Sequence, residues 1–292
     1  MSERSSTLSR LASARLACAI LLAIALCSGP PLPSFAHGSF HERIARANRA
    51  VEAEPDAPDP YLRRAEIHRH HGDFGEAMAD LERAAARDSG GREVDYFRGH
   101  VYLDSGRHED AEAAFGRFLA HEPRNPAALE GRARALAALG RHLEAADAYS
   151  RAIESRPVAV PATYLARADA LARAGDEYLP EALRGLDAGL AALGPVMTLQ
   201  RAAIDLEIRR GNFDAALARL EQASAAAPRQ ETWLARRGAI LESAGRLDEA
   251  RDSFERARRE MDRLPPHRRR TGAMTRLDAR LEQALARVSG NP

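Results

Sequence analysis

A glycine that returns every 34 residues constrains this chain more than any other feature. Gly72, Gly106 and Gly140 lie 34 residues apart, and so do Gly211 and Gly245. A fixed period of this length is typical of stacked repeats, in which each unit buries its apolar face only against its neighbours. The sequence therefore predicts a repeat architecture rather than one globular core.

Other residues keep the same spacing around this glycine. A small residue comes seven positions before it, and an alanine and a large apolar residue come five and nine positions after it. The glycine is suited to end one helix in the left-handed conformation, and the alanine allows a second helix to pack closely. The large residues are Leu81, Phe115, Tyr149, Leu186, Leu220 and Phe254. We expect six units, at 58–91, 92–125, 126–160, 161–196, 197–230 and 231–264.

This spacing resembles the tetratricopeptide repeat family over residues 40–290. The resemblance implies an all-α, right-handed superhelical solenoid of helix-turn-helix repeats. We expect the six repeats at 58–264, with capping helices in 37–57 and 265–292. The fourth repeat departs from the pattern through extra residues at 176–180, and the fifth has Ile204 and Glu207 where a small and a large apolar residue are usual.

Residues 1–36 have the pattern of a secretory signal peptide. Arginines precede an unbroken apolar run of thirteen residues at 16–28, prolines follow it, and cleavage is expected after Ala36. Both cysteines, Cys18 and Cys27, lie in this segment, so the mature chain is expected to be held by packing alone. We expect a periplasmic or secreted protein. An uncleaved anchor and a lipid on Cys27 remain alternatives, although the bulky Leu26 disfavours the lipid.

No pattern in the sequence points to catalysis or to a cofactor. A glycine-rich phosphate loop, a Gly-x-Ser-x-Gly motif and a cysteine–histidine pair are all lacking, so we expect no enzyme. The carboxylates recur at helical spacing, and we expect them on solvated helix faces. The formal net charge of +1 gives no footprint for nucleic acid, and the basic run 267–270 is interpreted as a solvated linker.

Histidines leave one metal hypothesis open. Cleavage after Ala36 would put His37 at the amino terminus with His41 close behind, and an amino group with imidazoles can chelate copper. The cluster His68, His70 and His71 is either a second candidate or a set of surface histidines near a helix end. A copper-handling protein is therefore the alternative to the function below.

The family resemblance implies a concave groove, lined by the first helix of each repeat, that binds a peptide or a helix of another protein. The corresponding positions give Glu66, Tyr96, His100, Arg134, Asp169, Arg173, Arg201, Asp205 and Arg209. The sixth repeat offers little beyond Glu242. The chain has no lysine, so the subclass that grips chaperone tails with lysine and asparagine is disfavoured.

Two interpretations of these groove charges stay open. In the first, the middle and later repeats form a mixed-charge peptide site in which arginine forks grip a ligand carboxylate. Its residues are Arg134, Arg173, Arg201 and Arg209 with Asp169 and Asp205. Alternatively, the charges pair with one another across neighbouring repeats. The overall prediction is a non-catalytic interaction scaffold of the cell envelope, with its protein partner unidentified.

Overall fold

The computed structural model describes residues 40–88, 91–158, 160–225 and 227–290, which form two units. The first unit ends at Pro55 and contains α2 (Phe40–Ala53). The predicted signal peptide and His37 lie outside the described residues. All the helices that follow belong to the second unit, and the described residues contain no strand.

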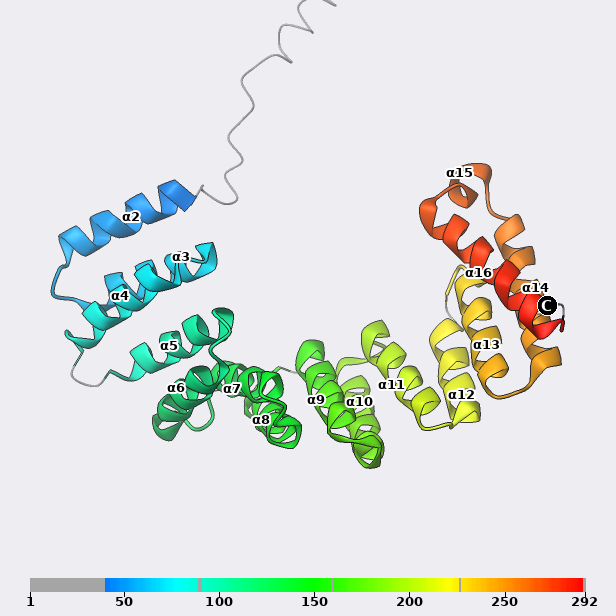
Figure 1. Cartoon of the computed structure of the whole chain (residues 1–292), viewed down its shortest axis with the longest axis horizontal. Coiled ribbons are helices and arrows are strands. Elements are labelled where there is room, and N and C mark those ends of the chain that lie inside the picture. Colours follow the sequence, from blue (N-terminus) through cyan, green and yellow to red (C-terminus); the bar gives the residue numbers. More distant parts are fainter. Residues whose placement is uncertain (1–39, 89–90, 159, 226, 291–292) are drawn as a thin grey trace, which may run out of the picture. The chain divides into compact units, whose positions relative to one another are not determined.

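Helices of the second unit come in pairs along the chain (Figure 1). The first helices of the pairs are α3 (Pro58–His71), α5 (Arg92–Asp104), α7 (Pro126–Ala138), α9 (Pro161–Ala174), α11 (Met197–Arg209) and α13 (Glu231–Ser243). The second helices are α4 (Phe74–Ala85), α6 (His108–His121), α8 (His142–Ser155), α10 (Leu179–Leu193), α12 (Phe213–Ser224) and α14 (Leu247–Asp262). The short α15 (Pro266–Arg269) and then α16 (Gly272–Val288) follow.

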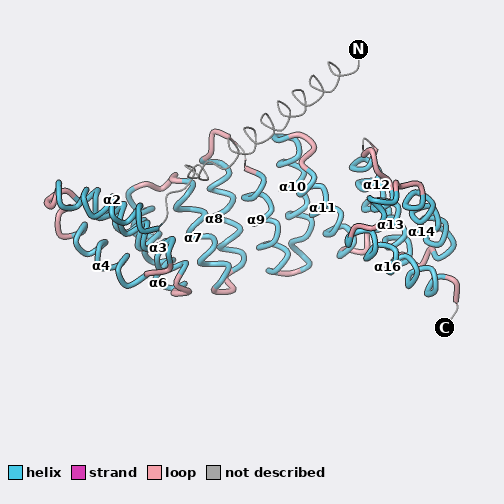
Figure 2. The backbone as a smooth tube through the Cα atoms, turned by 90° about the horizontal axis from the view of Figure 1, so that it is seen from above, coloured by secondary structure: helices cyan, strands magenta, loops and turns pink. Residues whose placement is uncertain are grey.

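Packing within the second unit is local in sequence. From α3 to α14, each helix packs against the next one along the chain, as α7 to α10 show in Figure 2. In addition, α3 contacts α5, α5 contacts α7 and α9 contacts α11. Each pair therefore completes its core only with its neighbours, which is how stacked repeats are stabilised. The predicted fold class, an all-α repeat solenoid, is confirmed.

Left-handed glycines end five of the first helices, as the sequence predicts. The φ angles are 92° at Gly72, 77° at Gly106, 76° at Gly140, and 74° at both Gly211 and Gly245. A side chain would be strained in this conformation, whereas glycine adopts it freely. The fourth repeat differs, because its extra residues form a 3-10 turn, η1 (Asp176–Tyr178), before α10 begins.

The repeated large residues are buried, and one of them is tightly enclosed. Phe115 of α6 is fully buried and lies against backbone where α5 and α7 carry glycines. A Cβ built on Gly99 would stand 2.7 Å from the Phe115 ring, and one on Gly131 would also overlap it. Glycine at these two positions therefore makes room for the ring.

Three carboxylates correct the expectation that all of them are solvated. Asp80, Glu207 and Glu231 are buried, with 1%, 6% and 2% of their surface exposed. Each has an arginine beside it: Arg64 reaches Asp80 at 2.6 Å and Arg219 reaches Glu207 at 3.4 Å, while Arg229 pairs with Glu231. Spacing along a single helix does not predict this burial. The arginine partner lies on another helix for Asp80 and Glu207, and just before the start of α13 for Glu231.

The last helix, α16, packs on α13 and α14. Its buried stripe consists of Met274, Leu277, Leu281, Ala284 and Val288. These side chains share one core with Leu241, Ala250, Phe254, Ala257 and Met261. Burying such a stripe fixes the helix on the sixth repeat, because each large apolar side chain contributes about 1.5–3 kcal/mol.

Candidate functional site

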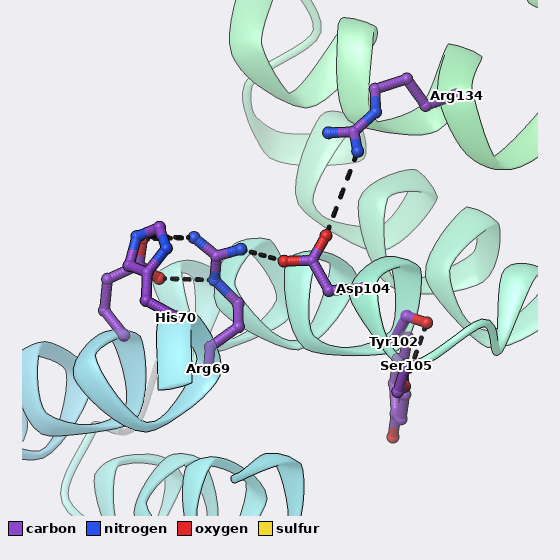
Figure 3. Close-up of polar contacts among 7 residues, drawn as sticks. Arg69, His70, Tyr102, Asp104, Ser105 and Arg134 are labelled. Atoms are coloured by element: carbon purple, nitrogen blue, oxygen red, sulfur yellow. Dashed lines mark hydrogen bonds and ion pairs between the residues drawn. The ribbon is translucent and has the colours of Figure 1, made fainter. Parts of the chain in front are cut away.

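Charged side chains link the first helices of the first three repeats. Arg69 of α3 holds Glu66 with a 2.7 Å hydrogen bond and also donates a hydrogen bond to Asp104 of α5 (Figure 3). Arg134 of α7 lies 4.0 Å from the other oxygen of Asp104. Burial raises the pKa of Glu66, but the hydrogen bonds and charge of Arg69 outweigh it and leave that pKa lowered. The predicted groove residues Glu66 and Arg134 thus have ion-pair partners on these first helices, in Arg69 and Asp104.

Aromatic rings lie beside this network. The ring centroids of Tyr96 and His100 are 4.7 Å apart, and those of His100 and Phe115 are 5.0 Å apart. Burial lowers the pKa of His100 to about 4, and the positive charge of Arg69 adds to the effect. His100 is therefore neutral at pH 7 and part of the repeat packing.

We expect His100 to weaken the fold as the pH falls. Its unfolded pKa is about 6.5, so between about pH 6.5 and 4 the unfolded chain takes up a proton that the folded chain does not. The free energy of unfolding should fall across this window by about 2–3 kcal/mol. Denaturation of the His100→Gln variant against pH should show a flatter slope than the wild type. Equal slopes would contradict the assignment.

The predicted groove charges of the fourth and fifth repeats also form ion pairs within the protein. Asp169 and Arg173 lie on α9 and form a 2.7 Å ion pair one turn apart. Arg209 of α11 lies 2.6 Å from Asp176 of the 3-10 turn. Exposed pairs of this kind contribute about 0–1 kcal/mol. Arg173 therefore has a carboxylate partner of its own on α9.

A cleft of about 650 Å³ opens where the last repeats meet α16, and we call it the C-terminal cleft. Its lining comes from α11, α13 and α16, together with Phe254 of α14. Trp233, Leu277 and Leu281 are among its apolar lining, and the neighbouring Met197 is 42% exposed. Large apolar side chains that line an open cleft are typical of sites that bind another molecule.

Arginines dominate the charge of the C-terminal cleft. Arg236 donates a hydrogen bond to Asp205, and Arg287 lies 2.7 Å from Glu242. Arg201 and Arg280 have no carboxylate partner in the part of the chain that the structure describes. The cleft thus combines an apolar lining with two arginines that no carboxylate of the described residues neutralises.

The sequence identified only part of this cleft. Of the predicted groove positions, Arg201 and Glu242 line it, and Asp205 pairs with its Arg236. The sixth repeat contributes more residues than the sequence indicated. Residues missed as site residues are Met197, Trp233, Arg236, Leu277, Arg280, Leu281 and Arg287. The chain's single tryptophan was the one available signal, because a large aromatic residue outside the repeat pattern is unusual in a chain with 5% aromatic residues.

The comparisons with known proteins assign the family. A family model described as tetratricopeptide repeat matches residues 35–92, 97–160 and 201–265, together more than half of the chain. The chain belongs to the tetratricopeptide repeat family. Members of this family bind other proteins. A comparison with curated proteins found no match.

Solved tetratricopeptide repeat structures share the fold. A repeat protein from Parabacteroides merdae is 17% identical with a TM-score of 0.51, covering 84% of this chain and 93% of its own. The C-terminal part of one from Cytophaga hutchinsonii is 12% identical with a TM-score of 0.60, covering 74% and 88%. A chain of the Naa15/Naa10 structure bound to HypK-THB is 19% identical with a TM-score of 0.52, covering 86% and 37%.

The described residues contain neither a candidate metal site nor a helix that could span a membrane. No group of three or more histidine, cysteine, aspartate or glutamate side chains there is arranged to hold a metal ion. His41 is exposed on α2, and its proposed partner His37 lies outside the described part, so the copper hypothesis stays a prediction. Among the described helices of this tetratricopeptide repeat protein, none is long and apolar enough to cross a membrane.

Proposed function

We propose that this protein is a non-catalytic scaffold that binds another protein through the face formed by its first helices. The observation that carries the proposal is the C-terminal cleft, which is lined by the exposed Met197 and the half-buried Trp233. Two of its arginines, Arg201 and Arg280, have no carboxylate partner within the described residues. Most other charged side chains on the first helices already have ion-pair partners. The cleft is therefore the part of this face best suited to bind a charged partner. The family supports a binding role, and one of the structures with a similar fold is Naa15/Naa10 bound to HypK-THB.

Site-specific crosslinking tests the binding role. A photo-crosslinking residue at Thr232, which lines the cleft, should trap a partner in cells, and the partner should bind the purified chain again. The matched control is the same residue at Ala188, which is exposed on α10 and lies outside the cleft. Trapping of the same proteins from both positions, or from neither, would contradict a binding face at the cleft.

We also propose that the protein works in the cell envelope, after export and removal of residues 1–36. The support is the sequence of that segment: a basic start, a thirteen-residue apolar run and small residues before the cleavage point. An alkaline phosphatase fusion at residue 60 should be active, because this enzyme needs the oxidising envelope to form its disulfides. Mass spectrometry of the purified chain should find His37 at the amino terminus. An inactive fusion would contradict export.

A further inference from the structure

We infer that the C-terminal cleft takes a segment of the partner that carries carboxylates beside a large apolar side chain. This inference rests on the proposed function, since it names the chemistry of the partner at the same site. It also gives α16 a second role: the helix covers the apolar face of the sixth repeat and in addition forms one wall of the site.

The charge of the cleft selects carboxylates. Four arginines line it, Arg201, Arg236, Arg280 and Arg287, against one lining carboxylate, Glu242. Arg236 and Arg287 form ion pairs with Asp205 and Glu242. Arg201 and Arg280 have no carboxylate partner within the described residues. A guanidinium fork matches the geometry of a carboxylate, and such charge-assisted hydrogen bonds are about twice as strong as neutral ones. An acidic segment would supply the missing partners.

The lining of the cleft selects a neighbouring apolar side chain. Trp233 of α13 and Leu277 and Leu281 of α16 border it, together with Met197 of α11. Tryptophan and arginine are the residues that most often dominate binding energy at protein interfaces. At about 650 Å³, the cleft has the size of a ligand pocket and suits a short stretch of peptide rather than a whole domain.

Packing holds the walls in place before a partner arrives. Leu281 and Ala284 face the core that α16 shares with Phe254, and they are at most 4% exposed. The wall of the cleft is therefore the outer edge of a buried helix interface. A preformed site loses little conformational entropy on binding, which favours affinity.

The protein carries its own probe for this test, because Trp233 is its only tryptophan. Short peptides with blocked ends are titrated in which glutamate, glutamine or lysine flanks a central leucine or phenylalanine. We expect the glutamate peptides to change the Trp233 emission and to bind at least about tenfold more tightly than the glutamine ones. Binding should weaken as the ionic strength rises. Peptides with a free carboxyl terminus show whether an internal or a terminal carboxylate is preferred.

Charge-reversal variants assign the binding to the cleft. The double variant Arg201→Glu/Arg280→Glu should lose affinity for the glutamate peptides by on the order of a hundredfold. The matched control is Arg184→Glu/Arg258→Glu, which makes the same charge change at two exposed arginines outside the cleft and should bind as the wild type does. This comparison is needed because Trp233 also borders a second hollow between α12 and α13.

Several outcomes would overturn the inference. They are equal binding of glutamate, glutamine and lysine peptides, equal losses in the two double variants, or a Trp233 change caused only by self-association at rising protein concentration. A partner crosslinked at Thr232 whose binding survives Arg201→Glu/Arg280→Glu would overturn the carboxylate preference while leaving the scaffold function standing. Failure to trap any partner would count against the scaffold function itself.

Discussion

Replacing Phe115 by alanine is expected to lower the free energy of unfolding by about 3–5 kcal/mol. The ring is fully buried, and the glycines of α5 and α7 that it contacts have no side chains to fill the space that it leaves. Urea denaturation followed by circular dichroism gives the magnitude. Hydrogen exchange should show the largest loss of protection in α5, α6 and α7, because contacts in a repeat stack are local.

A double-mutant cycle separates the fit of the ring from simple burial. Gly131→Ala should destabilise the wild type by about 1–2 kcal/mol, because the new methyl overlaps the Phe115 ring despite the better helix propensity of alanine. In a Phe115→Leu background the smaller side chain should remove most of this cost. The control is Gly116→Ala on α6, where the added methyl meets no atom within 4 Å and alanine should stabilise the helix. A Gly131→Ala cost that is the same in both backgrounds would contradict a tight fit.

Replacing Asp80 by alanine is expected to cost about 3 kcal/mol. The Asp80 side chain of α4 is 1% exposed and accepts hydrogen bonds of 2.7 and 2.6 Å from the Arg64 fork on α3. Arg83 donates a third hydrogen bond of 2.7 Å. Removing the carboxylate takes away both hydrogen bonds that Asp80 accepts from the Arg64 guanidinium, whose side chain is only 15% exposed. Thermal and urea denaturation measure the loss.

Two further variants identify the cause of this cost. Asp252→Ala removes an exposed carboxylate that lies 3.8 Å from Arg256 on α14, and it should change stability by no more than about 0.5 kcal/mol. Arg64→Met/Asp80→Leu replaces the buried pair by apolar side chains and should recover much of the stability lost in Asp80→Ala. If Asp80→Ala and Asp252→Ala cost the same, the buried pair does not stabilise the first repeat.

Residue spacing predicted the repeat fold because each unit contacts mainly its neighbours. The left-handed glycine, the small alanine and the large apolar residue act within one helix pair, so their positions can be read along the chain. Phe115 and its surrounding glycines follow this pattern. The buried Asp80 does not, since its burial depends on an arginine sixteen residues away that spacing alone cannot pair with it.

The sequence by itself determined the helical repeat, its 34-residue period and the glycines that end the first helices. These features are local, and local backbone preferences and apolar periodicity encode them directly. Only the tertiary structure decided which groove charges form ion pairs and which have no carboxylate partner within the described residues. That outcome depends on side chains from α11, α13 and α16, where residues up to ninety positions apart line one cleft. No periodic signal links them, because α16 lies outside the repeats and meets α13 only through packing.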